Sequence, residues 1–159
     1  MNRKEHARTT STGNQKTILL VDDDPSVREM VGRVLTGEGY LVLTAANGPE
    51  ALRIAASTAI DLVLLDLNMP GQSGWDTFER LTSGNPLLAI VIITARSQQL
   101  FTAVNAGTGA LLEKPLDYPK MLQTIRDLLA ESPETRITRL TGKRADFHYL
   151  PSKKREPPE

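Results

Sequence analysis

The stretch at residues 59–76, AIDLVLLDLNMPGQSGWD, decides the fold of this chain. Its almost unbroken apolar run, residues 60–65, is typical of a strand buried on both faces of a parallel sheet. The run ends on a carboxylate, Asp66, and a loop with proline and glycine follows it. In open parallel α/β sheets, ligands bind beyond the carboxyl ends of the strands. We therefore interpret Asp66 as the reactive group; the alternative is a strand-end aspartate that only caps the next turn.

Length and composition narrow the class of protein. The chain has 159 residues, of which 40% are hydrophobic and 24% charged, which indicates one soluble globular domain with short appendages. No apolar run reaches the length of a membrane span, and the polar N-terminus lacks the hydrophobic segment of a secretory signal. The absence of cysteine excludes disulfides and thiol chemistry. These features predict a cytoplasmic location with no membrane partner.

Composition divides the chain into three parts. Residues 1–16 are polar and lack hydrophobic periodicity, which predicts a disordered leader. Residues 17–132 carry the alternating apolar pattern of one domain and are acidic overall, whereas both ends are basic. Residues 133–159 are interpreted as a C-terminal extension that is mostly disordered or loosely packed.

The C-terminal extension leaves alternatives open. The serine, proline and glutamate at residues 132–134 resemble a helix start, so a short extra helix can form there. An apolar cluster at residues 147–150 allows, instead of a loose tail, a peptide that docks on the domain or on a partner. The basic run at residues 153–155 offers only a modest electrostatic contact, so nucleic acid is not an expected partner.

Apolar segments alternate with amphipathic ones along residues 17–131, a pattern that predicts strands alternating with helices. Pro25 suits the first turn of a helix and Asp24 is a favoured N-cap, so Asp22 and Asp23 stay at the end of the first strand. Gly107 is the expected stop of the fourth helix. The strands are predicted at residues 17–21, 40–44, 60–66, 87–94 and 110–112, and the helices at about 25–37, 49–56, 75–81, 98–106 and 118–131.

This alternation predicts an α/β fold: a flavodoxin-like, doubly wound, five-stranded parallel sheet in the order 2-1-3-4-5, with helices on both faces. The order places the first and third strands side by side, so Asp22 and Asp23 face Asp66. Thr94 ends the fourth strand and Lys114 follows the fifth, on the same rim of the sheet. Side chains from separate segments are therefore expected to converge there.

Carboxylates crowded on one rim repel one another, and a hard divalent cation relieves that repulsion. Mg²⁺ takes oxygen ligands from one or two carboxylates, with waters and a phosphate oxygen completing the shell. Asp22, Asp23 and Asp66 are the candidate carboxylates, and the backbone carbonyl of Asn68 is close enough in sequence to join them. The set suits phosphoryl transfer, which depends on positioning and electrostatics.

The remaining polar groups fit the same chemistry. Lys114 supplies a positive charge and Thr94 a hydroxyl donor, and Asp66 would be the nucleophile that forms an acyl phosphate. Each of these residues also has an ordinary structural alternative: helix capping for Asp22 and Asp23, a β-branched strand position for Thr94, a solvated turn for Lys114. Their joint placement on one rim favours the functional interpretation.

Four motifs resemble the receiver domain of two-component response regulators, in order and in spacing. They are LLVDDD at 19–24, LLDLNMPGQSG at 64–74, IITA at 92–95 and EKPLD at 113–117. The resemblance covers about residues 16–131 and is specific because all four motifs occur together. It implies a phosphoacceptor protein, a stand-alone receiver of the chemotaxis type. Such a protein signals by protein–protein interaction and catalyses only its own phosphotransfer and autodephosphorylation.

The same resemblance implies residue roles and partners. Asp66 would accept a phosphoryl group from the phosphohistidine of a sensor histidine kinase or a histidine phosphotransfer protein. Asp22 and Asp23 would be the acidic Mg²⁺ pair, Asn68 would give its carbonyl, and Thr94 and Lys114 would contact the phosphoryl group. The resemblance also implies a cis peptide bond between Lys114 and the next proline. A monomer or weak homodimer is expected, with an unidentified downstream protein partner.

The chain departs from the receiver pattern in two places. Receivers commonly carry Tyr or Phe three residues before the lysine, where this chain has Leu111. The segment between Thr94 and Lys114 is also two residues shorter than usual. One alternative function is therefore a receiver-like scaffold that binds its partner regardless of phosphorylation. A second is a Mg²⁺-dependent phosphatase of the haloacid dehalogenase type, but Leu67 and Asn68 follow Asp66, so the D-x-D motif of that class is missing.

Overall fold

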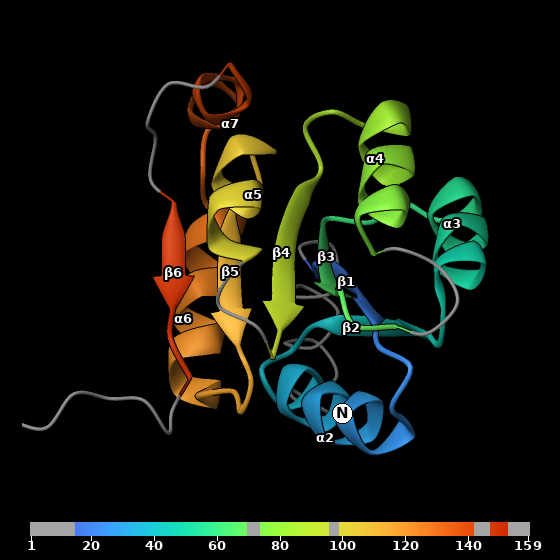
Figure 1. The fold of residues 1–159 in the computed structure, drawn as a ribbon. Helices are drawn as coiled ribbons and strands as arrows, with labels where there is room; N and C mark the ends of the chain where they lie inside the picture. The colour runs from blue at the N-terminus through green and yellow to red at the C-terminus, as the bar shows by residue number, and fades with distance from the viewer. Residues whose placement is uncertain (1–14, 70–73, 96–98, 142–146, 153–159) are drawn as a thin grey trace, which may run out of the picture.

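The protein is described here by a computed structural model that covers residues 15–69, 74–95, 99–141 and 147–152. Helices and strands alternate along these residues (Figure 1). The predicted leader lies outside them except for its last two residues. The strands are β1 Thr17–Val21, β2 Leu41–Ala45, β3 Leu62–Asp66, β4 Ala89–Thr94, β5 Ala110–Glu113 and β6 His148–Leu150; the helices are α2 Pro25–Gly37, α3 Gly48–Ser57, α4 Gly74–Gly84, α5 Leu100–Asn105, α6 Tyr118–Leu129 and α7 Pro133–Leu140.

The strands form one parallel sheet in the order β2-β1-β3-β4-β5-β6. The order predicted for the first five strands is confirmed, and so is the flavodoxin-like alternation of strands and helices. β1, β3, β4 and β5 are buried along their whole length, as their continuous apolar sequences predict. β2 lies at one edge of the sheet and is only partly buried.

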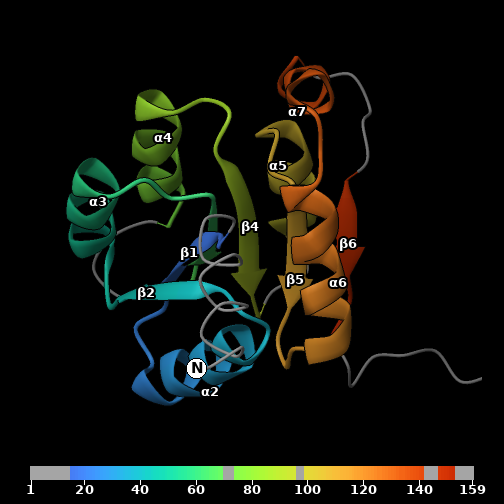
Figure 2. The ribbon, with the colours of Figure 1, turned by 180° about the vertical axis from the view of Figure 1, so that it is seen from behind.

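Two apolar layers hold the helices against the sheet. One face packs against α2 and α6, and Figure 2 shows α6 lying across β5 and β6 on this side. The other face packs against α3, α4 and α5. Alternate residues of each central strand point into opposite layers, which is why these strands are apolar throughout. Ile18, Leu20, Leu64 and Ile93 contribute to the first layer, and Leu19, Leu65, Ile92 and Leu111 to the second.

Side-chain caps fix where the helices begin. Asp24 caps α2 by accepting a hydrogen bond from the Ser26 amide at 2.8 Å, as predicted. Asn47, Asp117 and Ser132 cap α3, α6 and α7 in the same way. The caps at Asp24, Asn47 and Asp117 start α2, α3 and α6 just beyond the carboxyl ends of β1, β2 and β5.

Beyond residue 132 the described residues form a helix, α7, and a strand, β6. α7 is the short extra helix that the sequence allowed after Ser132, and β6 lies in the apolar cluster that the sequence allowed as a docked peptide. β6 pairs in parallel with β5, so the sheet has one strand more than the pattern predicted. A segment as short as His148–Leu150 shows no usable periodicity, because a period of two needs more residues to be recognised. The basic run at 153–155 lies outside the described residues.

A search of the described residues for a helix long and apolar enough to cross a bilayer finds none.

Candidate functional site

Three carboxylates meet at the carboxyl end of the sheet. Asp66 is the last residue of β3, and Asp22 and Asp23 follow the last residue of β1, its neighbour in the sheet. One oxygen from each of these residues lies within 4.8 Å of the others. Asp22 and Asp66 are buried, each only 1% exposed, whereas Asp23 faces solvent. The convergence predicted from the strand order is therefore present.

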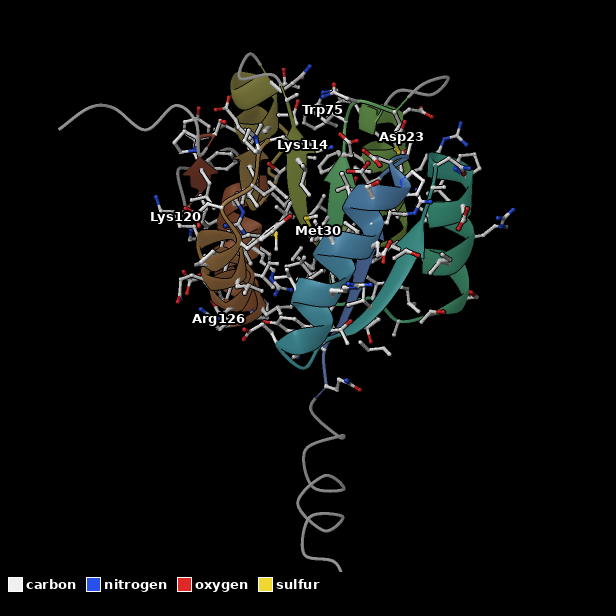
Figure 3. All side chains as sticks on the ribbon, turned by 90° about the horizontal axis from the view of Figure 1, so that it is seen from below. Asp23, Met30, Trp75, Lys114, Lys120 and Arg126 are labelled. Atoms are coloured by element: carbon white, nitrogen blue, oxygen red, sulfur yellow. The ribbon has the colours of Figure 1, made fainter. Side chains whose placement is uncertain are left out.

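Lys114 lies between two of these acids. Its Nζ donates to Asp22 Oδ2 at 3.0 Å and approaches Asp66 Oδ2 at 3.4 Å. The lysine follows β5, and its backbone amide donates to the Thr94 carbonyl at 2.8 Å, which ties the ends of β4 and β5 together. The Lys114–Pro115 peptide bond is cis, as the resemblance implies. Figure 3 shows Lys114 and Asp23 at the same end of the molecule, away from Arg126.

Asn68 and Thr94 complete the pocket. The Asn68 amide donates to Asp66 Oδ1 at 3.0 Å, which orients the carboxylate from its own loop. The Asn68 side-chain amide donates to Thr94 Oγ1 at 3.4 Å, and Thr94 is fully buried at the end of β4. The hydroxyl predicted for phosphoryl contact thus lies beside the loop that follows Asp66. The loop residues 70–73 lie outside the described part of the chain.

Burial and charge shift the pKa values of the two central groups. Burial raises the pKa of the Asp66 carboxyl, and the charge of Asp22 adds to this effect, while the Asn68 amide and the Lys114 charge oppose it. Burial alone would lower the pKa of the Lys114 ammonium, but its hydrogen bond to Asp22 and the charge of Asp66 outweigh that and raise it. Lys114 therefore stays protonated, whereas the charge on Asp66 is costly without a further cation.

Sequence reasoning missed Arg28. Its guanidinium, on the second turn of α2, donates to the backbone carbonyl of Asp22 at 2.6 Å. The amide of Asp24 donates to Asp22 Oδ1 at 2.9 Å, so hydrogen bonds hold both the backbone carbonyl and the carboxylate of Asp22. The sequence did carry a signal for this contact: Arg28 stands four positions after the helix cap, Asp24. A residue at that spacing lies one turn along the helix, on the same side as the cap and near the acids.

The site's donor set suits a divalent cation with oxygen ligands. Three carboxylates share one ammonium, which leaves an excess of negative charge at a solvent-facing rim. Asp66 presents one oxygen to Lys114 and the other to the Asn68 amide. Of the three carboxylates, Asp23 is exposed to solvent, whereas Asp22 and Asp66 are buried. The fold and this site define a class: a doubly wound α/β protein with an acidic, lysine-containing pocket at the switch point of its sheet.

Comparisons with known proteins agree with this class. Residues 18–126 match the response regulator receiver domain. The transcriptional regulatory protein GlrR of Escherichia coli is 37% identical over 117 residues, a match that covers 72% of this chain and 26% of GlrR. A CheY-like receiver domain protein of Methanospirillum hungatei has a TM-score of 0.69 at 28% identity and covers 73% of this chain and 94% of its own.

A third relative has been solved with ligands. The response regulator TrrA of Thermotoga maritima, crystallised in complex with Mg²⁺ and BeF, is 32% identical with a TM-score of 0.67, covering 72% of this chain and 99% of its own. The chain thus spans whole receiver structures but only about a quarter of the GlrR sequence.

The chain belongs to the response regulator receiver domain family. This family is the phosphoacceptor domain of two-component signalling. The phosphatase alternative is thereby set aside. The stand-alone arrangement stays a prediction.

Proposed function

We propose that Asp66 is the phosphoacceptor, and that Mg²⁺ is held by Asp22, Asp23, Asp66 and the carbonyl of Asn68. The observation that carries the proposal is the position of Lys114, whose ammonium lies 3.0 Å from Asp22 and 3.4 Å from Asp66. A lysine so placed neutralises charge that develops beside Asp66 without blocking its second oxygen. The TrrA structure with Mg²⁺ and BeF supports the metal assignment by likeness.

The transfer follows from these positions. An Asp66 oxygen attacks phosphorus and forms an O–P bond while the N–P bond to the donor's histidine breaks, and the electron pair goes to the imidazole nitrogen. The imidazole then takes up a proton. Bound Mg²⁺ would supply Lewis-acid stabilisation of the phosphoryl oxygens. Lys114 and the Thr94 hydroxyl would each contact one phosphoryl oxygen, which fixes its orientation.

The proposed partners follow from the same chemistry. The donor is a sensor histidine kinase or a histidine phosphotransfer protein, and the output is binding to a downstream protein. A cytoplasmic location is proposed because it is typical of receiver domains. The protein is proposed to act as a monomer or weak homodimer, without nucleic acid.

The second candidate function is binding of the partner regardless of phosphorylation. It is favoured by Leu111, a fully buried aliphatic residue at a position where receivers commonly carry an aromatic one.

Phosphoryl uptake tests the proposal. We expect the protein to gain the mass of one phosphoryl group when it is incubated with acetyl phosphate and Mg²⁺, and chelation of the metal should prevent the gain. Asp66→Asn should gain none, because an amide is not a nucleophile towards phosphorus. Intact-mass spectrometry measures both. A matched control is Asp61→Asn, outside the pocket; equal uptake by wild type and Asp66→Asn would refute the assignment and leave the phosphorylation-independent candidate.

The raised pKa of Asp66 predicts how Mg²⁺ stabilises the fold as pH changes. Without metal, the folded protein binds a proton on Asp66 more tightly than the unfolded chain does, so protonation of Asp66 stabilises the fold. This stabilisation is complete at a pH below 3.8, the ordinary pKa of the carboxyl, and is lost as the pH rises through the higher pKa of Asp66 in the folded protein. Mg²⁺ binds the ionised form, so the increase in melting temperature that it causes should grow across the same interval. Thermal unfolding with and without saturating Mg²⁺ measures this. An increment independent of pH, or one that persists in Asp66→Asn, would contradict the assignment.

A further inference from the structure

β6 lies outside the part of the chain that matches the receiver family, yet it completes the sheet. It occupies the free edge of β5, with Leu111 opposite Tyr149 and Leu112 opposite Leu150 (Figure 1). The amide of His148 donates to the Gly109 carbonyl at 3.2 Å at the start of the strand. The chain itself therefore covers a sheet edge that would otherwise be open to other strands.

The far end of β6 is attached through Glu113, a buried carboxylate that the phosphoryl-transfer mechanism does not use. The amide of Ser152 donates to Glu113 Oε1 at 3.1 Å. Glu113 is 2% exposed and Ser152 is 5% exposed, so the bond is shielded from water. A hydrogen bond to a buried carboxylate is stronger than one between neutral groups. Glu113 is thus the anchor of the C-terminal end of β6.

β6 is weakly attached compared with the other strands. Its three residues give it the shortest ladder in the described sheet, and Tyr149 is 37% exposed. Short elements at an edge open with less free energy than central strands. The hydrogen bond from Ser152 to Glu113 therefore contributes a larger share of the attachment of β6 than one bond contributes in a central strand.

The anchor and the phosphoryl site are joined by consecutive residues. Glu113 is the last residue of β5, and the next residue is Lys114, whose ammonium contacts Asp22 and Asp66. Glu113 is also the ladder partner of Thr94. Glu113 and Lys114 share a peptide unit, so the anchor of β6 and the phosphoryl site are one residue apart on the same backbone.

We propose that β6 is a releasable strand whose attachment to β5 weakens when Asp66 carries a phosphoryl group. This inference rests on the proposed function. The phosphoryl group on Asp66 carries more negative charge than the carboxylates of Asp22 and Asp66 that the Lys114 ammonium now contacts. The ammonium therefore moves towards the phosphoryl group. The Glu113 carboxylate is thereby drawn away from the Ser152 amide, and the edge of β5 opens.

Hydrogen exchange followed by mass spectrometry of the full chain tests the inference in two arms. In the first, Glu113→Gln keeps an acceptor but removes its charge, so the peptide containing residues 148–152 should exchange roughly tenfold faster without any ligand. Glu79→Gln, an exposed glutamate on α4, is the matched control and should leave that peptide unchanged. If Glu113→Gln also leaves it unchanged, Glu113 is not the anchor and the inference is refuted.

In the second arm, Mg²⁺ and beryllofluoride are added to the wild type. We expect the 148–152 peptide to exchange severalfold faster while the β1 peptide is unaffected, and Asp66→Asn should show no change. Fluorine NMR reports whether beryllofluoride is bound. Bound beryllofluoride with unchanged exchange at 148–152 overturns this inference alone, whereas no binding overturns the proposed function and the coupling together.

Discussion

Lys114→Met is expected to take up phosphoryl groups at least about 100-fold more slowly than the wild type, the usual effect of removing one preorganised electrostatic donor. The ammonium lies within reach of both Asp22 and Asp66, so its loss removes the charge that would stabilise the transferring group. Intact-mass time courses with acetyl phosphate and Mg²⁺ measure the rate.

The same substitution should tighten Mg²⁺ binding, by about tenfold. The ammonium competes with the metal for the carboxylates, and its side chain is only 26% exposed, so solvent screens that repulsion incompletely. Calorimetric titration of Mg²⁺ gives the dissociation constant. Slower phosphoryl uptake together with tighter Mg²⁺ binding would show that Lys114 acts in the transfer, because a defect in folding would weaken both.

Lys120→Met is the matched control, because Lys120 is an exposed lysine that lies 3.9 Å from Asp117 and outside the pocket. It should change neither quantity appreciably. If Lys114→Met weakened Mg²⁺ binding as well as slowing uptake, Lys114 would be maintaining the shape of the pocket, and its proposed contact with the phosphoryl group would lose its support.

Arg139→Met is expected to lower the free energy of unfolding by about 3 kcal/mol, since removing one partner of a buried ion pair leaves the other uncompensated. Arg139 on α7 donates to Glu131 Oε2 at 2.8 Å, and the two side chains are 6% and 8% exposed. We expect the lower end of the usual range because Arg136 Nε lies 3.9 Å from Glu131 and offsets part of the loss. Urea unfolding followed by circular dichroism measures the change.

Arg33→Met is the matched control for this substitution. Arg33 also pairs with a glutamate, Glu29, but the two side chains are 79% and 66% exposed. Such pairs contribute less than about 1 kcal/mol. Equal losses for the two variants would show that α7 contributes no more to stability than a surface ion pair does.

Much of the fold and of the pocket could be predicted from the sequence because both depend on strand ends. A continuous apolar strand such as β3 is recognisable without a structure, and parallel strands bring their carboxyl ends to one edge. That geometry alone predicted that Asp22, Asp66 and Lys114 would meet. The helix cap at Asp24 could likewise be predicted from neighbouring residues alone, because an aspartate before a proline marks a helix start.

Other features depended on how one element is placed against another. The hydrogen bond from Arg28 to the Asp22 carbonyl spans only six residues, but it requires the position of α2 relative to the end of β1. β6 is recognisable only by its pairing with β5, since a strand of three residues has no measurable period. The partner of Glu131 comes from a helix that the sequence marked only by its start.

β6 is made by the ribosome after every other strand described here, because it comes last in the chain. A nascent chain therefore presents the bare backbone of β5 until α6, α7 and β6 have been synthesised. Bare strands attract other chains, and an inward-pointing charge is one of the ways in which natural sheets discourage this. Glu113, a buried carboxylate at the end of β5, is a charge of this kind, and in the complete chain it accepts the hydrogen bond of the Ser152 amide.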